Sequence, residues 1–104
     1  MSKSRRLELH EKLCTILGSR NVYFQPPGTV KMVYPCIRYQ RDRGDHTYAD
    51  NRTYIYRQAY QIIYIDPNPD NDIVDKLIEN LPEISYIRNY VANNLNHDVF
   101  TLYY

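Results

Sequence analysis

The chain has 104 residues, which is enough for one domain and too few for two. Basic and acidic residues nearly balance, 13 against 12, and the net charge of +1 argues against a general nucleic-acid-binding surface. The start of the chain is charged but precedes no apolar segment, and no run approaches the roughly 18 apolar residues of a membrane span. We therefore expect no secretory signal and no membrane segment, and a chain made in the cytoplasm of the producing cell.

Residues 4–17 carry the pattern of an amphipathic helix. Apolar residues recur at helical spacing from Leu9 to Leu17 and form one stripe. Gly18 follows this stripe, at a place where a residue in the left-handed conformation commonly ends a helix. The next segment, 21–25, is predicted as a short strand or an extended arm.

Two strand patterns rich in Tyr, Ile and Val cover residues 32–40 and 54–65. The segment between them is predicted as a long hairpin loop over residues 41–53, since hairpin loops usually need only about two to five residues. Loops that exceed this need tend to carry function, so we interpret this loop as a contact element; a solvated hairpin tip is the alternative. Its predicted contact residues are Arg41, Asp42, Arg43, Asp45, Tyr48, Asp50 and Arg52.

A second helix is predicted after the link at residues 66–70. Asn68 suits the N-cap, Pro69 suits the first helical position, and Pro82 ends the helix. Acidic residues near the start of this segment favour the positive end of a helix dipole.

Two further strands are predicted at residues 84–91 and 98–104, with a turn at residues 93–97 between them. The last strand ends in Tyr103 and Tyr104. Because chain ends normally fray, we expect this apolar end to pack within the domain or against a neighbouring protein, and we include both tyrosines among the predicted protein contacts.

The order helix, three strands, helix, two strands predicts an α+β fold. Short links between successive strands favour antiparallel pairing, and a sheet with both helices on one face is the simplest arrangement. We therefore predict one domain over residues 1–104, with a mostly antiparallel sheet of four to five strands and two helices packed on one face.

Charge is unevenly distributed along the chain. Residues 1–20 contain five basic and two acidic residues, whereas residues 66–83 contain six acidic residues and one lysine. A basic end and an acidic end would let copies of the chain associate head to tail, and two separately solvated helix faces are the alternative.

The spacing of the acidic and amide residues from 66 to 72 resembles that of a calcium-binding loop, but the segment departs from the calcium-loop template. Asn71 stands where the template requires Gly, and Leu77 stands where it requires Glu. Helix capping explains the same residues, and we predict no metal site and no cofactor. The positions concerned are Asp66, Asn68, Asp70 and Asp72.

The three histidines and two cysteines show no metal-binding or redox spacing. Cys14, in a predicted helix, and Cys36, in a predicted strand, are expected to be small buried apolar residues. A nucleophile pair of either cysteine with His97 is the alternative. We predict no catalytic residues and interpret the chain as a non-enzyme.

Tyrosine is unusually frequent, at 12 of 104 residues. This surplus indicates surface that is covered in the working state, because tyrosine combines an apolar ring with a polar hydroxyl. Tyr and Arg interleave through residues 34–64, which is also typical of single-stranded nucleic-acid platforms. Acidic residues dilute this stretch, and mixed charge fits a protein partner better.

Four segments taken together carry a family resemblance. They are Tyr34-Pro35-Cys36-Ile37-Arg38-Tyr39, Tyr48-Ala49-Asp50-Asn51, Asp66-Pro67-Asn68-Pro69-Asp70 and the tail from Asn94 to Tyr104. With these segments in this order, the chain resembles the small tail-completion proteins of long-tailed phages, near the tail terminators, over residues 5–104.

The resemblance implies a structural virion protein at the head–tail interface, made in the bacterial host cytoplasm. Tail terminators have a sheet flanked by helices, form a six-membered ring on the last ring of the tail tube, and stop tube growth. The implied partners are other copies of the chain, the tail tube protein and a head-completion or connector protein, while DNA passes through the ring lumen without specific binding. The alternatives are a head-completion (stopper or adaptor) protein and a small single-stranded nucleic-acid-binding module.

Overall fold

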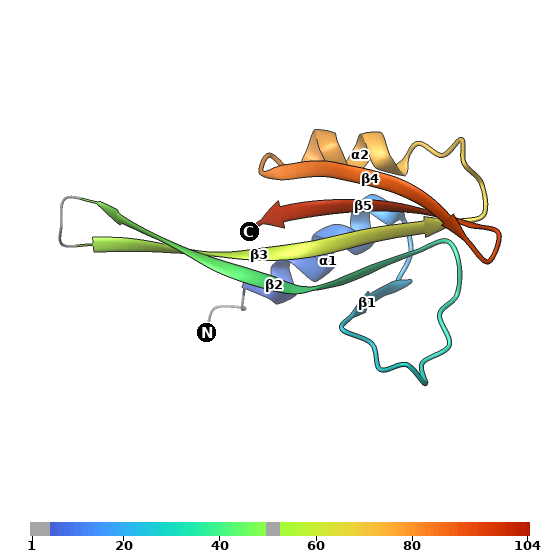
Figure 1. Ribbon diagram of the computed structural model, residues 1–104, viewed down its shortest axis with the longest axis horizontal. Helices are drawn as coiled ribbons and strands as arrows, with labels where there is room; N and C mark the ends of the chain where they lie inside the picture. The colour runs from blue at the N-terminus through green and yellow to red at the C-terminus, as the bar shows by residue number, and fades with distance from the viewer. Residues whose placement is uncertain (1–4, 50–52) are drawn as a thin grey trace.

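The computed structural model describes residues 5–49 and 53–104, with the side chains of residues 43–57 left aside. Five strands form one sheet in the order β1-β2-β3-β5-β4, antiparallel except for the β1–β2 pair. Both helices lie on the same face of this sheet (Figure 1). The predicted α+β fold and its order of elements are therefore confirmed. The elements are α1 (Arg5–Leu17), β1 (Val22–Phe24), β2 (Cys36–Ala49), β3 (Thr53–Asp66), α2 (Ile73–Asn80), β4 (Ile84–Ala92) and β5 (Leu95–Tyr103).

The core lies between the two helices and the helix-side face of the sheet. Leu9 and Leu13 of α1 and Leu77 of α2 are fully buried there. They meet a row of alternating residues on the strands, because side chains two positions apart share one face of a strand. The buried residues of this face are Ile37, Tyr39, Tyr60, Ile62, Tyr64, Phe100 and Leu102.

The two helices cover different parts of the helix-side face of the sheet. α1 packs against β1 and β2, whereas α2 packs against α1 and β4. β3 and β4 run parallel because both are antiparallel to β5, which lies between them, so α2 forms the crossover of a split β-α-β unit. Gly18 ends α1 with a φ of 81°, as the sequence predicts for a left-handed residue at this place.

The predicted hairpin loop at 41–53 is largely wrong, because β2 continues through Ala49 and pairs with β3 as far as Thr53. The strand also begins at Cys36 and not at residue 32, directly after Pro35, which has no N–H to pair. The charged sequence shows no strand pattern because, among the described residues, this part of β2 has only β3 beside it. Neither of its faces needs to be apolar there, so no two-residue hydrophobic alternation arises.

The second helix begins at Ile73, four residues later than predicted. Asn68 does not cap it; its side-chain oxygen accepts from the N–H of Asp70 at 3.0 Å in a local turn. Asn71 supplies the cap instead, accepting from the N–H of Ile73 at 3.1 Å and of Val74 at 3.3 Å. Side chains of this type bond readily to nearby backbone, which favours turns over a continuous helix.

The turn predicted at 93–97 is only two residues long. Asn93 and Asn94 both have positive φ, 53° and 61°, the geometry of a tight hairpin turn whose twist matches the strands. β5 therefore starts at Leu95, opposite Ala92. Asn tolerates the left-handed conformation better than most residues, so the Asn pair itself was the signal for this turn.

Burial distinguishes two adjacent apolar residues of α2. We expect Leu77→Ala to lower the free energy of unfolding by about 2–5 kcal/mol, because it leaves a cavity in the core. The control is Ile78→Ala, which removes a side chain that is 47% exposed and should change it by about 0.5 kcal/mol or less. Denaturant unfolding measures both. Equal losses in the two variants would contradict the position of α2.

Candidate functional site

The far end of the β2–β3 hairpin projects beyond the rest of the sheet (Figure 1). β1 pairs with β2 only at residues 37–39, and β5 pairs with β3 only at residues 59–66. From the Gly44–Gln58 pair to the Ala49–Thr53 pair, the two strands have no third strand beside them in the described chain, and Gln58, at the near end, also accepts from the N–H of Tyr104. At about 3.4 Å per residue this ribbon is about 20 Å long. We call residues 44–49 and 53–58 the arm.

A β-bulge marks the root of the arm. Between Arg41 and Gly44 the chain advances three residues on β2 against two on β3, from Tyr60 to Gln58. Bulges bend and twist a strand, and they are common where a sheet changes its environment. Here the bulge stands where the third strand ends. The arm is thus set off from the body by the backbone itself.

The predicted contact residues divide between this root and the arm. Arg41 and Asp42 are exposed at the root. Arg43 precedes the arm, and Asp45 and Tyr48 lie within it by their backbone position in β2. Asp50 and Arg52 lie outside the described residues. An isolated two-stranded ribbon is marginally stable in water, so the arm is suited to contact with another surface.

Basic side chains lie on aromatic rings around the root of the arm. The guanidinium of Arg6 is 4.3 Å from the ring centre of Phe24, and that of Arg41 is 5.8 Å from the same centre. On the other side of α1, Arg5 and Lys12 lie 5.8 and 6.0 Å from the ring centre of Tyr104. Cations at these distances are attracted by the negative face of a ring.

The two C-terminal tyrosines belong to the same region. The N–H of Tyr104 donates to the carbonyl of Gln58, 3.1 Å away, and its half-buried ring packs against the core. Tyr103 is paired with Ala59 in the sheet, next to the root of the arm. Residues 103 and 104 are thus held within the domain, and the ring of Tyr104 is the one that Arg5 and Lys12 contact.

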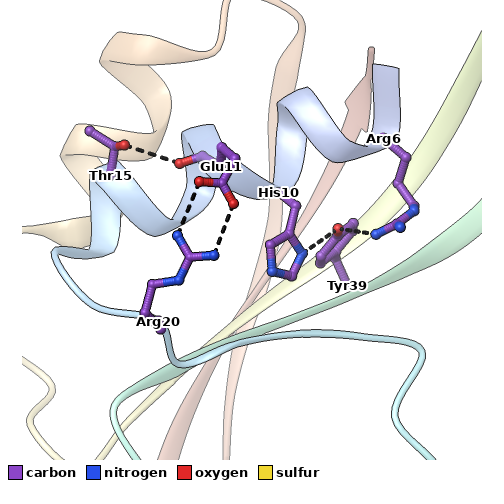
Figure 2. Close-up of polar contacts among 6 residues, drawn as sticks. All are labelled: Arg6, His10, Glu11, Thr15, Arg20 and Tyr39. Carbon is purple, nitrogen blue, oxygen red and sulfur yellow. Dashed lines mark hydrogen bonds and ion pairs between the residues drawn. The ribbon is translucent and has the colours of Figure 1, made fainter. Parts of the chain in front are cut away.

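Tyr39 connects α1 to the sheet just before the arm leaves it. Its ring is fully buried, 4.9 Å from Phe24 and 6.0 Å from Tyr60 between ring centres. Its hydroxyl lies 3.2 Å from Nη1 of Arg6 and 2.8 Å from Nδ1 of His10, as Figure 2 shows. A buried hydroxyl needs such partners, because leaving it unpaired costs about 1–3 kcal/mol.

The donors in this group determine the state of His10. Arg6 can only donate, so the Tyr39 oxygen accepts from it, and the Tyr39 hydrogen is available to donate to Nδ1 of a neutral His10. Burial, followed by the charges of Arg6 and Arg20, lowers the pKa of His10 below its ordinary value, which agrees with this arrangement.

The turn after α1 is fastened to the helix by an exposed ion pair. Both guanidinium nitrogens of Arg20 donate to the two carboxylate oxygens of Glu11, at 3.1 and 2.9 Å (Figure 2). The Thr15 hydroxyl donates to the carbonyl of Glu11 at 3.0 Å. Exposed ion pairs contribute only about 0–1 kcal/mol, so this pair positions the turn more than it stabilises the fold.

The face of the sheet opposite the helices carries a second group of basic and aromatic residues. The rings of Tyr90 and His97 stack with their centres 4.6 Å apart, and the guanidinium of Arg88 lies 5.6 Å from the Tyr90 ring centre. Arg38 lies on the same face, since its neighbour Tyr39 points to the helices.

The structure separates the residues of the possible nucleophile pair. Cys36 and His97 both lie on the face of the sheet opposite the helices, which we call the open face. Ile65 of β3 pairs with both residues and lies between them, so Cys36 and His97 are two strands apart, about 10 Å. Burial raises the pKa of the Cys36 thiol to about 11 and also raises that of Cys14. Both thiols are buried and free, as predicted.

Two of the acidic residues with calcium-loop spacing make contacts with residues close to them in the sequence. Asp66 is buried and accepts from the Tyr64 hydroxyl and from the N–H of Asn68. Asp72 forms an exposed ion pair with Lys76 at 3.3 Å. Asp72 also occupies the N-cap position of α2, near the positive helix end as predicted, but its side chain makes no capping hydrogen bond.

Four tyrosines of the predicted nucleic-acid platform have described side chains; three of them are core residues, and Tyr34 is exposed. Tyr39, Tyr60 and Tyr64 are each at most 3% exposed and face the helices, so their rings have no free face for a base. The sequence reading missed the Tyr90–His97 stack and the group around Tyr39. No local pattern signals either one, because each forms between segments distant in the sequence.

No protein-family model matches the chain, and a comparison with curated proteins found no match. Within residues 5–49 and 53–104, no helix is both long and apolar enough to cross a membrane.

The lowered pKa of His10 makes stability depend on pH. Between the lowered pKa and the value of about 6.5 in the unfolded chain, the unfolded state binds more protons, so stability rises with pH and is lost as pH falls. We expect the free energy of unfolding to decrease as pH falls below about 6.5, and His10→Gln to lose this part of the pH dependence. Denaturant unfolding between pH 5 and 8 measures it, with Tyr39→Phe as a second variant that removes the hydroxyl. An unchanged pH profile in His10→Gln would contradict the arrangement.

Proposed function

We propose that this chain is a structural subunit of a phage tail, a tail terminator or tail-completion protein that caps the tail tube and joins it to the head connector. The observation that carries the proposal is the arm, which extends about 20 Å beyond the last supporting strand. A ribbon of this kind gains stability when another protein covers it. An assembly subunit supplies such a covering surface, whereas a monomeric enzyme has no use for it.

The form of the molecule supports a ring of identical copies. The arm leaves one end of the sheet, and no symmetry within the chain repeats it at the other end (Figure 1). A contact between an arm and a different surface of the next copy is heterologous, and such contacts form a ring when the rotation from copy to copy closes and an open filament when it does not. In the proposed assembly the chain forms a homo-hexameric ring, contacts the tail tube protein and a head-completion or connector protein, and lets DNA pass through its lumen.

The chemistry of the cysteines agrees with a role that is structural and not catalytic. Both thiols are buried, and burial raises the pKa of each, so little of the reactive thiolate forms at neutral pH. We therefore propose no reaction for this chain.

The proposal predicts where the protein is found and what its loss does. Purified particles should contain it at the head–tail joint in electron microscopy, with a copy number per particle that fits a ring. Particles made without it should show tail tubes of irregular length and separate heads. If heads leak DNA while tails have normal length, the chain is instead a head-completion protein. Absence from purified particles would contradict both roles.

The open face of the sheet favours a second candidate, binding of single-stranded nucleic acid. Arg38, Arg88 and the stacked Tyr90–His97 pair offer cations and rings on that face. Single-strand platforms combine these two elements. The face is small for this purpose, and the net charge of +1 gives little long-range attraction.

A binding measurement tests this second candidate. If it holds, a fluorescent oligonucleotide should bind the protein and be released as salt rises, and Arg88→Ala with Tyr90→Ala should weaken binding about tenfold or more. The control is Lys76→Ala, on the opposite side of the sheet, which should leave binding unchanged. Failure to bind at micromolar protein in low salt would exclude the nucleic-acid role.

A further inference from the structure

β4 is an unprotected edge of the sheet. It pairs only with β5 within the described chain, and residues 85–91 are all exposed. Its exposed apolar side chains include Ile87 and Val91, at 53% and 65%. The opposite edge, β1, is only three residues long.

β4 also lacks most features that prevent edge-to-edge pairing. Natural edge strands are usually short, charged, interrupted by proline or bent by bulges. β4 has nine residues, no proline, and Arg88 as its only charge. A bulge at Ile87 disturbs its register with β5, after which Arg88 to Ala92 pair regularly. The free backbone of this second half is thus an available template for another strand.

The arm matches this edge in form. It is about 20 Å long, and β4 spans about 30 Å at 3.4 Å per residue, so the arm fits along β4.

The charges near the arm and near β4 are also complementary. Asp75 and Glu79 are exposed acids of α2, which packs against β4, and the exposed Glu83 directly precedes β4. The root of the arm carries the exposed bases Arg5 and Arg41. When an arm lies along the β4 edge of another copy, its basic root therefore approaches an acidic rim. Opposite charges in such positions fix the register of a contact.

We propose that the arm of one copy pairs with β4 of the next copy, so that the sheet continues from subunit to subunit. This inference rests on the proposed ring, and it specifies which two surfaces make the self-contact. The occupant of the β4 edge is a second copy of this chain, because the described part of the same molecule carries both a two-stranded ribbon with no third strand beside it and a sheet edge with no strand beyond it.

Val91→Lys tests the contact, because a lysine on an edge strand opposes pairing with a further strand. We expect this variant to raise the concentration at which the oligomer dissociates by at least about tenfold, equivalent to about 1.4 kcal/mol. The matched control is Val33→Lys, which alters a residue of similar exposure, 59%, outside the sheet. Native mass spectrometry over a protein concentration series gives the dissociation, and circular dichroism shows that both variants remain folded.

Cross-linking identifies the surfaces directly. A mixture of Val91→Cys and Thr47→Cys copies should form an intermolecular disulfide, whereas Val33→Cys with Thr47→Cys should not. The same mixtures are tested in purified protein and in assembled particles. An oligomer that persists in Val91→Lys, with no Val91–Thr47 cross-link in either sample, overturns this contact and leaves the ring in place. A chain absent from particles and monomeric at all concentrations overturns the ring itself.

Discussion

Burial of the Tyr39 ring is the interaction on which the rest of the structure depends. The ring lies between Phe24 and Tyr60, and its hydroxyl reaches Arg6 and His10 of α1. A tyrosine can be fully buried in this way only when its hydroxyl has partners, so the sheet face and the first turns of α1 must meet at this point. That contact fixes α1 across β2 and determines where the helical cover of the sheet ends.

β3 consequently passes through two environments. From Ala59 to Asp66 it lies between β2 and β5 and is largely buried, whereas from Thr53 to Gln58 it pairs with β2 alone. One end of the hairpin thus belongs to the core and the other forms the arm. The described chain supplies no strand beside the arm and none beside the outer edge of β4, and the proposed contact with a second copy would supply a strand to both. This shared deficit connects the arm to self-assembly more directly than the resemblance to tail-completion proteins does.

The uneven charge of the sequence takes a different form in the folded molecule. The basic segment 5–20 and the acidic segment 66–83 both lie on the helix side of the sheet, and α1 packs against α2. Each segment includes an internal ion pair, Glu11 with Arg20 and Asp72 with Lys76. The basic residues therefore lie near the root of the arm and the acidic residues near β4, and the two groups do not mark opposite ends of an elongated molecule.

The sequence by itself determined the two helices, the order of elements, the left-handed Gly18 and the burial of both cysteines, because each depends on local spacing or on a residue's own preference. It did not show that residues 41–49 are strand, since a ribbon without a third strand needs no apolar alternation. Only the tertiary structure decided that Tyr39, Tyr60 and Tyr64 are core residues and that β4 is a free edge. Those outcomes depend on which face the helices cover and which strand lies outermost, and both are set by packing between segments far apart in the chain.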